Sequence, residues 1–521
     1  MTVAEWPLVG GVYDDVGRAT RALKEHLKRL GVDVGAIRRA LIAAYEAEAN
    51  VVIHARRGTM RCYFGPGQLD VEVEDEGPGI PDIDLALREG FSTAPLAARE
   101  LGFGAGMGLP SIRRNSDRFS LQSTVGRGTR VAFSVRYRPQ EGGVVVGHSV
   151  AVEAARCQRC RRCVRACPVQ AVRLRDSGPS ILEHLCIDCA ACLAVCPTGA
   201  LGLRGRSDAP AVDGGTLVVP DALLVQFGAA VRPADALAAL ERLGHRDVRT
   251  LEPWERGLRA AAAERARANS GPRPVIAPFC PAVLNLVASR FPGLLAQVAP
   301  FLTPLEAARR ALQTRPAAFV TLCPAQRSSL TSTTGPGAAE LVAPTSLLRE
   351  MLGVLVGRPR PTVDEAASPV AAPTTAPAVL VATGLRHVLR VLDEAENGAL
   401  GDVLLLELWA CDGGCFGSPL LREDPAIAGH RARTWSVGDG PVAPAEPLAV
   451  ERQVRRGVRL DPDLSRAVQL LGEIDRLARA LPGRDCADCG APTCQALAED
   501  VVLGRAMLAA CPHRPVEEEL R

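Results

Sequence analysis

Seventeen cysteines are the residues of this chain whose type and spacing best predict a chemistry, and eight of them form two runs of one pattern. Each run reads C-x2-C-x2-C-x3-C and is closed by a proline. The members are Cys157, Cys160, Cys163, Cys167 and Pro168, then Cys186, Cys189, Cys192, Cys196 and Pro197. In such a doubled run, three thiolates hold one [4Fe–4S] cluster and the fourth holds the other. We therefore expect one cluster on Cys157, Cys160, Cys163 and Cys196, and a second on Cys186, Cys189, Cys192 and Cys167.

Structural zinc is the alternative for these runs, because zinc sites also use C-x2-C pairs. The doubled spacing and the closing prolines favour iron–sulfur clusters, and the segment resembles the two-cluster ferredoxins of bacteria. Arginines crowd the first run; they could raise a cluster potential, meet an acidic redox partner, or simply be solvated. These are Arg156, Arg159, Arg161, Arg162 and Arg165.

A third set of cysteines lies near the C-terminal end, in GRDCADCGAPTC and one predicted helix later: Cys486, Cys489, Cys494 and Cys511. This segment resembles the small iron–sulfur domain of electron-transfer proteins and of some hydrogenase-related chains. We expect it to hold one further [4Fe–4S] cluster. Cys62 stands apart and is expected to be a buried thiol.

Four cysteines remain, in VIAPFCP, FVTLCPAQ and ELWACDGGC: Cys280, Cys323, Cys411 and Cys415. Their order and flanking text resemble the H-cluster domain of iron-only hydrogenases, over about residues 216–438. In that family the four cysteines hold a [4Fe–4S] cubane, and the last one also bridges to a two-iron subcluster. The resemblance therefore implies a cubane on these four positions.

The residues around these cysteines depart from that family. Phe279 stands where the family has a proton-transferring cysteine, and Trp409 stands where it has a methionine. Gln326 replaces a lysine that pairs with the two-iron unit, which leaves Arg327 as the nearest cation. The glycine run after the last ligand becomes Phe416-Gly417-Ser418-Pro419. Because outer-shell groups orient and tune metal ligands, we predict that this domain keeps its cubane and has lost the two-iron subcluster.

Three pieces near the N-terminus predict a nucleotide site. Glu46 and Asn50 lie four residues apart, hence on one face of a predicted helix. Asp75 ends a predicted strand and could accept a hydrogen bond from an exocyclic amine. Asparagine can hold a divalent metal, and glutamate can polarise a hydroxyl. Glycines that let backbone N–H groups approach phosphates follow at Gly77, Gly79, Gly102, Gly104, Gly106 and Gly108.

In this order, the three pieces resemble the ATPase domain shared by gyrases and histidine kinases, and most closely the anti-sigma-factor-type serine kinases. The resemblance implies that Asn50 binds Mg²⁺, that Glu46 acts as base and that Asp75 binds adenine. Phe91-Ser92-Thr93 matches the position of the family's lid. We expect ATP binding, and protein serine kinase activity is left open.

Periodicity predicts helices over 15–30, 34–55 and 464–480, and strands over 60–64, 69–74, 119–123 and 129–135. Residues 359–377 are rich in Pro and Ala and predict a linker. The expected fold class is multidomain α+β and α/β: an α/β-sandwich histidine-kinase-type ATPase, a bacterial ferredoxin-like dicluster domain, a hydrogenase-like α/β domain and a small helical 4Fe-4S domain. The expected boundaries are 1–137, 148–206, 215–440 and 460–521.

Bulk composition excludes several classes of function. A net charge of +3 over 521 residues predicts no nucleic-acid partner. The start has no signal-peptide pattern and no apolar stretch is long enough to span a bilayer, so we expect a cytoplasmic protein without a membrane partner. In a reducing compartment the cysteines should be metal ligands rather than disulfides.

Three functions are consistent with the sequence. The first is a redox-regulatory or electron-transfer protein with ATP, Mg²⁺ and up to four [4Fe–4S] clusters. The second is a working iron-only hydrogenase with an ATP-regulated front end. The third is a serine kinase with iron–sulfur domains as scaffold. The expected partners are a redox partner protein and an anti-sigma-antagonist-type, phosphatase or kinase regulatory protein; the sequence favours the first function.

Overall fold

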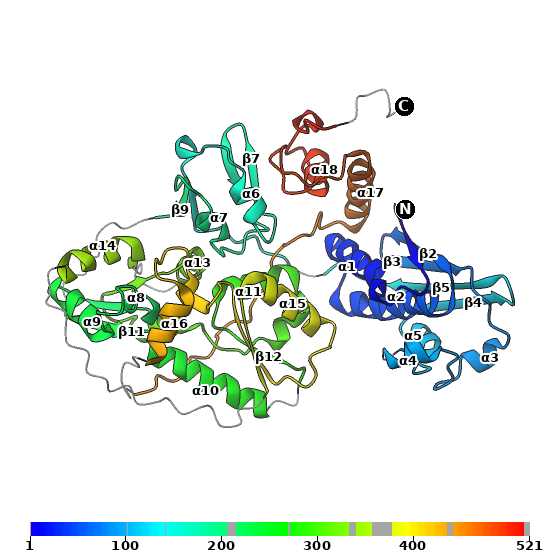
Figure 1. The fold of residues 1–521 in the computed structure, drawn as a ribbon, viewed down its shortest axis with the longest axis horizontal. Coiled ribbons are helices and arrows are strands. Elements are labelled where there is room, and N and C mark those ends of the chain that lie inside the picture. Colours follow the sequence, from blue (N-terminus) through cyan, green and yellow to red (C-terminus); the bar gives the residue numbers. More distant parts are fainter. Residues whose placement is uncertain are drawn as a thin grey trace. The chain divides into compact units, whose positions relative to one another are not determined.

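The computed structural model describes residues 2–101, 103–140, 142–205, 215–268, 271–332, 340–356, 378–434 and 441–514. Gly102 and the predicted linker 359–377 lie outside these residues. The chain divides into two compact units (Figure 1). Unit 1 comprises Met1–Gly142, Val458–Asp485 and Thr493–Arg521, and unit 2 comprises Gly143–Gly457 and Cys486–Pro492.

Unit 1 is built on a five-stranded antiparallel sheet in the order β1-β2-β3-β5-β4. Its strands are β1 (Thr2–Val9), β2 (Arg57–Gly65), β3 (Gln68–Asp75), β4 (Arg118–Thr124) and β5 (Gly128–Arg136). Every second residue of β2 is buried, namely Met60, Cys62 and Phe64, as expected for a sheet with one covered face. The four predicted strands are present, and β1 is one that the sequence did not predict. Pro7 is tolerated in β1 because this strand lies at the edge of the sheet.

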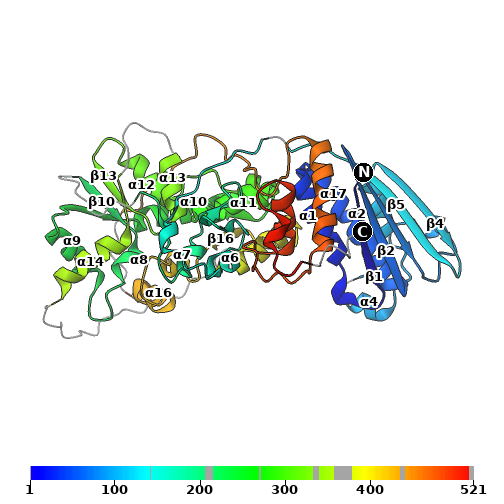
Figure 2. The ribbon, with the colours of Figure 1, turned by 90° about the horizontal axis from the view of Figure 1, so that it is seen from above.

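Helices cover one face of this sheet, and Figure 2 shows α1, α2 and α17 together on that side. The helices of unit 1 are α1 (Arg18–Leu30), α2 (Val34–His54), α3 (Ile83–Ala86), α4 (Leu96–Glu100), α5 (Gly108–Arg114), α17 (Leu464–Ala480) and α18 (Cys494–Val502), with short 3₁₀ turns η1 (Tyr13–Asp15) and η5 (Leu508–Ala510). Asp33 caps α2 by accepting a hydrogen bond from the Ala36 amide at 2.9 Å. The predicted helices 34–55 and 464–480 match α2 and α17, whereas 15–30 begins later, at Arg18, because a 3₁₀ turn precedes it.

Unit 2 contains a small repeated fold around the doubled cysteine run. Two antiparallel strand pairs, β6 with β9 and β7 with β8, flank two short helices. The bounds are β6 (Val150–Val152), η2 (Ala154–Arg156), α6 (Arg162–Ala166), β7 (Val172–Arg175), β8 (Gly178–Ile181), α7 (Ala191–Ala194) and β9 (Leu201–Leu203).

The rest of unit 2 holds two parallel sheets covered by helices, in the orders β11-β10-β13-β14 and β12-β16-β15. The strands are β10 (Thr216–Val219), β11 (Asp247–Thr250), β12 (Val275–Ala277), β13 (Ala317–Val320), β14 (Glu340–Val342), β15 (Val379–Thr383) and β16 (Leu405–Trp409). The helices are α8 (Asp221–Leu224), α9 (Pro233–Arg242), α10 (Glu252–Ala268), α11 (Pro281–Arg290), α12 (Pro304–Ala311), α13 (Pro324–Ser332), α14 (Pro344–Leu355), α15 (Leu385–Glu396) and α16 (Pro425–Thr434), with 3₁₀ turns η3 (Pro292–Gln297) and η4 (Gly414–Gly417).

One apolar core joins the cysteine-run fold to the parallel sheets within unit 2. Val169, Ala171 and Ile187 come from the cysteine-run fold and are buried together with Ile276 and Leu406 of the sheets.

Because the parallel strands of unit 2 are covered on both faces, their sequences are runs of apolar residues. Among the described residues, no helix combines the length and apolar character that a membrane span requires.

Candidate cluster and nucleotide sites

The doubled cysteine run brings together the sulfur atoms that the spacing predicts. Burial raises the pKa of the Cys163 thiol to about 11, and the neighbouring Cys157, Cys160 and Cys196 add to this increase. These four are the first predicted ligand set. Sulfur atoms that raise one another's pKa need a nearby cation to stay ionised, so the donor set fits a bound iron cluster.

The second predicted set also converges. Burial raises the pKa of Cys189 to about 12, and Cys167 adds to the increase. Burial also raises the pKa of Cys192, with further contributions from Cys189 and Cys167. Cys167 therefore lies with the second run although it belongs to the first in sequence. None of the seventeen cysteines, all of which lie in the described part of the chain, forms a disulfide bond.

The backbone of both runs is shaped to surround a bound group. Arg159 and Arg161 have φ angles of 55° and 61°, and Asp188 and Ala190, at the equivalent positions, have 59° and 65°. Side chains rarely adopt this left-handed region, and such residues cluster where backbone N–H groups must turn inward. The Arg159 amide donates to the Cys157 sulfur at 3.4 Å, and the Asp188 amide does so to its own run's first sulfur at 3.5 Å. The loop geometry therefore fits a cluster as well.

The central cysteines lie where parallel strands end, which is the usual place for a site in such sheets. Cys280 follows β12, Cys323 follows β13, and Cys411 and Cys415 follow β16. All four line one cavity, whose walls also include Trp409. Burial raises the pKa of Cys323 to about 12, with a contribution from Cys280. The structure thus brings the four predicted cubane positions together.

The cavity of the central cysteines is also lined by Cys189, which belongs to the second cysteine run. Burial raises the pKa of Cys411, and Cys189 contributes to this increase along with Cys323 and Cys280. Cys186 of the same run and Cys167 of the first run, which share one predicted ligand set, pack against the shared apolar core. A cluster on the second run would therefore be a direct neighbour of one on the central cysteines, which spacing alone did not reveal.

Gln326 is buried, and its amide is fixed on both sides. Its Oε1 accepts from the Leu322 amide at 2.6 Å, and its Nε2 lies 3.9 Å from the Cys415 sulfur. The sulfur of Cys415 thus faces a neutral donor, from the position at which the resembled family has a lysine. Arg327 does not take that place, because its Nη2 donates to the Leu341 carbonyl at 2.5 Å.

Aromatic side chains occupy two other positions at which this chain differs from the iron-only hydrogenases. Phe279 and Trp409 stack with ring centroids 5.2 Å apart. The Arg259 guanidinium lies 4.9 Å from the centre of the Phe279 ring, and its Nε lies 3.1 Å from Glu407 Oε1. This stack is a packed structural element and offers no proton carrier at position 279. Trp409 lines the cavity that Cys415 also lines.

Replacing Gln326 with glutamate should lower the reduction potential of the central cluster. The change keeps the Oε1 acceptor for Leu322 but replaces the donor to the Cys415 sulfur by an oxygen, and hydrogen bonds to sulfur raise cluster potentials. EPR-monitored redox titration measures the shift. The exposed Gln313→Glu variant, with the same chemical change, should titrate like the wild type; an unchanged Gln326→Glu potential would contradict this account.

The nucleotide-site residues also meet. Helix α2 carries Glu46 and Asn50, and the start of α5 approaches it so closely that a Cβ on Gly108 would lie 3.2 Å from Glu46 Oε2 and 3.3 Å from Asn50 Oδ1. Burial raises the pKa of Glu46, which suits a base acting near neutral pH. A side chain at position 108 would crowd both groups, which explains why a glycine is found there.

Asp75 ends β3 and is oriented by two backbone donors. Its Oδ1 accepts from the Gly77 amide at 2.7 Å and the Thr129 amide at 3.2 Å. Burial raises the pKa of Asp75, and these two hydrogen bonds oppose the increase. The remaining predicted glycines that the structure describes have left-handed φ angles at Gly79, Gly104 and Gly106. Gly102 lies outside the described residues, so its role stays a prediction.

One buried carboxylate of this site was missed from the sequence. Glu48 is 1% exposed and lies between Glu46 and Asn50 in the chain, on another side of α2. Its two oxygens accept from the amides of Ala19 and Thr20, each at 3.0 Å, and from the Thr20 hydroxyl at 2.7 Å. Glu48 therefore anchors the start of α1 to the helix that carries the catalytic candidates. A charged residue facing inward in a helical pattern was the available signal.

Three family models match the chain. A histidine kinase-like ATPase domain covers residues 13–135, a 4Fe-4S dicluster domain covers 156–201, and a putative Fe-S cluster family covers 481–513. The serine/threonine-protein kinase RsbT of Bacillus subtilis is 33% identical over 134 residues, which is 25% of this chain and 88% of RsbT. The chain belongs to the RsbT family. This membership rests on the N-terminal part, because the match covers a quarter of the chain.

Other relatives of the RsbT-like part are anti-sigma F factors. That of Caldanaerobacter subterraneus subsp. tengcongensis is 34% identical over 97 residues, 18% of this chain and 64% of that protein. Among solved structures, the [FeFe]-hydrogenase HydA(deltaEFG) matches 44% of this chain and 86% of its own, with 15% identity and a TM-score of 0.33. The mycobacterial sensor histidine kinase MprB matches 26% of this chain and 99% of its own, with 16% identity and a TM-score of 0.18.

The hydrogenase-like prediction rests on the four central cysteines and on the cavity that they line. The family models and the RsbT relation support ATP binding and [4Fe–4S] binding by this member of the RsbT family. They also confirm the expected combination of a kinase-like ATPase domain with iron–sulfur domains.

Proposed function

We propose that this member of the RsbT family is a redox-regulatory electron-transfer protein that binds Mg-ATP and four [4Fe–4S] clusters. The observation that carries the proposal is the cavity in which Cys189 of the second run meets Cys280, Cys323, Cys411 and Cys415. A bound [4Fe–4S] cluster takes up and returns one electron. Cysteines of two runs in one cavity would hold two such groups close enough for transfer between them.

The chain's own residues would do the remaining work. The eight cysteines of the doubled run and the four central cysteines hold the clusters, and Cys486, Cys489, Cys494 and Cys511 are the proposed ligands of the fourth. Gln326 donates to the Cys415 sulfur, Trp409 lines the same cavity, and Phe279 stacks on Trp409. These contacts support a cubane without the two-iron subcluster.

Anaerobically purified protein should contain about sixteen irons and as much sulfide per chain, at four per cluster. After maturation with a synthetic two-iron cofactor, it should evolve no hydrogen from reduced dye. Infrared spectra should then lack the bands of iron-bound CO and cyanide. Zinc, or clearly fewer irons, would contradict the cluster count, and the appearance of those infrared bands would revive the hydrogenase alternative.

A protein serine kinase is the second candidate, favoured by the pairing of Glu46 with Asn50 beside Gly108 and by the RsbT relation. Its substrate would be a regulatory protein of the anti-sigma-antagonist type. Glu46 is placed to accept the hydroxyl proton of the substrate, and Asn50 to hold Mg²⁺. We also keep the cytoplasm as the proposed compartment, where free thiols persist.

Replacing Glu46 with glutamine should separate binding from transfer. The amide keeps the shape but cannot take a proton, so phosphoryl transfer should fall about 100-fold or more while ATP affinity stays within about threefold. The assay is phosphorylation of serine in candidate partner proteins with labelled ATP, alongside calorimetric ATP binding. Equal transfer rates for the wild type and the variant would exclude Glu46 as the base.

A further inference from the structure

Helix α17, near the C-terminal end of the chain, is packed into unit 1, the unit that contains the ATPase-like sheet. Helix α17 lies against α1 and the edge strand β1 (Figure 2). The Thr2 hydroxyl donates to the Val468 carbonyl at 2.8 Å, and a Cβ on Gly472 would come within 2.6 Å of Thr2 Oγ1. The Leu460 amide donates to the Arg29 carbonyl at 2.9 Å. Such close approach makes α17 part of the covering layer of the sheet.

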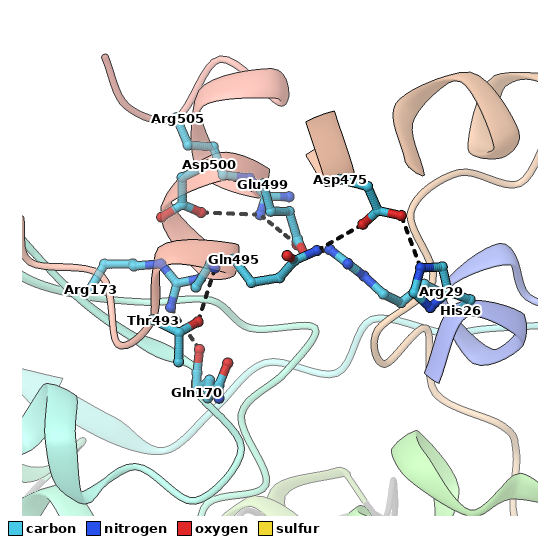
Figure 3. A network of polar contacts seen from close by, with 11 residues as sticks. His26, Arg29, Gln170, Arg173, Asp475, Thr493, Gln495, Glu499, Asp500 and Arg505 are labelled. Carbon is cyan, nitrogen blue, oxygen red and sulfur yellow. Dashed lines mark hydrogen bonds and ion pairs between the residues drawn. The ribbon is translucent and has the colours of Figure 1, made fainter. Parts of the chain in front are cut away.

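Asp475 of α17 joins α1 to α18, as Figure 3 shows. Its Oδ2 lies 2.9 Å from His26 Nε2 of α1, and its Oδ1 accepts from Gln495 Nε2 of α18 at 3.2 Å. Gln495 directly follows Cys494, a proposed cluster ligand. One carboxylate thus connects the neighbour of that cysteine to a helix of the ATPase fold.

His26 is held firmly in this connection. Its ring stacks on Phe64 of β2, with centroids 5.5 Å apart, and meets Trp6 of β1 edge-on at 5.6 Å. Its Nδ1 lies 2.9 Å from the Ala22 carbonyl. Both ring nitrogens therefore lie within hydrogen-bond distance of an oxygen, one of a carbonyl and the other of the Asp475 carboxylate.

An ion pair of Arg29 with Glu499 also connects α1 to α18. Arg29 of α1 pairs with Glu499 of α18 at 2.5 Å, and both side chains are largely buried (Figure 3). Burial raises the pKa of Asp475, but the hydrogen bonds with His26 and Gln495 and the Coulombic effects of His26 and Arg29 outweigh it, so the pKa is lowered. Helix α18 is therefore tied to α1 through charges rather than through apolar contact alone.

The opposite end of α1 is anchored to α2, the helix that carries Glu46 and Asn50. Its first turn is anchored by Glu48 of α2, whose oxygens accept from Ala19 and Thr20. Glu48 lies between Glu46 and Asn50 in the same helix. A displacement of α1 would therefore act on the helix that carries the proposed base and the proposed Mg²⁺ ligand.

We infer that α1 couples the charge of a cluster held by the C-terminal segment to the affinity of the ATP site, with Asp475 as the positioning residue. This inference rests on the proposed binding of ATP and of the C-terminal cluster. One-electron reduction by an external donor such as dithionite adds a negative charge next to Gln495. That charge repels the Asp475 carboxylate and loosens its hold on α1, so reduction weakens ATP binding.

The test uses the full chain, with binding of a fluorescent ATP analogue measured anaerobically in oxidised and dithionite-reduced protein. The wild type should bind about fivefold or more weakly when reduced, which is the usual size of such couplings. Asp475→Asn keeps the size and one acceptor but loses the charge, and its affinities in the two states should agree within about twofold. Glu473→Gln, an exposed position of the same helix, should behave like the wild type.

Thermodynamic linkage between ATP binding and cluster reduction supplies a second measurement, the reduction potential. A purely structural role of Asp475 would not change how this potential responds to ATP. If reduction weakens ATP binding fivefold, then Mg-ATP must lower the reduction potential of the same cluster by about 40 mV, since tenfold corresponds to about 59 mV for one electron. The Cys494→Ser variant identifies the relevant EPR signal by its loss. Asp475→Asn should retain that signal but not its shift with ATP.

The outcomes separate the inference from the proposed function. A wild type that binds no ATP in either state overturns both. ATP binding that is equal in the two states overturns the coupling while leaving ATP and cluster binding intact. A difference that persists in Asp475→Asn shows that another route than the Asp475 contact carries it, and overturns the role assigned here.

Discussion

Replacing Asn50 with alanine is expected to reduce the affinity for Mg-ATP about 100-fold or more. Asn50 Oδ1 faces the start of α5 beside Glu46, where it is placed to hold Mg²⁺. Loss of outer-shell groups already costs 10- to 100-fold at metal sites, and loss of a direct ligand should cost at least as much. Calorimetric titration with Mg-ATP measures the effect.

The control for this change is Arg38→Ala. Arg38 is an exposed residue of the same helix α2, and alanine favours helices, so its variant should bind ATP like the wild type. Both variants should keep the same iron content, because the cysteines are untouched. Wild-type affinity in Asn50→Ala would remove Asn50 from the site and weaken the assignment of the neighbouring Glu46.

Replacing Cys411 with serine is expected to remove one complete cluster. Iron and sulfide should each fall by about four per chain, from about sixteen to about twelve. Burial raises the pKa of Cys411, with contributions from Cys323 and Cys280, so three crowded sulfur atoms would remain without their shared cation. Thermal stability should fall too, because metal binding contributes to folding. Iron and sulfide analysis with EPR and calorimetry checks both effects.

Cys62→Ala is the matched control for cluster loss. Cys62 is fully buried in β2, and burial raises its pKa. Its replacement should leave iron and sulfide unchanged and reduce stability only modestly, through the lost packing volume. If Cys411→Ser keeps all its iron, the central cysteines do not hold a cubane.

The cluster sites could be predicted largely from sequence because their constraint is local. The C-x2-C-x2-C-x3-C spacing fixes which sulfur atoms can reach one cluster, and Cys167 and Cys196 lie with the sets to which the spacing assigned them. The helices α2 and α17 could also be predicted, because the spacing of their apolar residues and their capping residues lie within the segment itself. Their ends differ from the predictions by at most one residue.

Other features depend on segments far apart in the chain, and no local sequence pattern predicts them. The contact between Asp475 and His26 joins residues 449 positions apart, and no pattern within either helix predicts it. The sharing of one cavity by Cys189 and Cys415 arises from tertiary packing. Strand β1 contains Pro7, a residue that weakens the sequence signal for a strand although it is tolerated at a sheet edge.

The apolar core that joins Ile187 to Ile276 and Leu406 has a consequence for how this chain can be divided. A fragment that stops at Gly205 would expose Val169 and Ala171 to water, and a fragment that starts after it would leave the facing side of α11 bare. Neither part has a complete apolar core without the other. We therefore expect a chain cut at this boundary to give two unstable fragments rather than two independent domains.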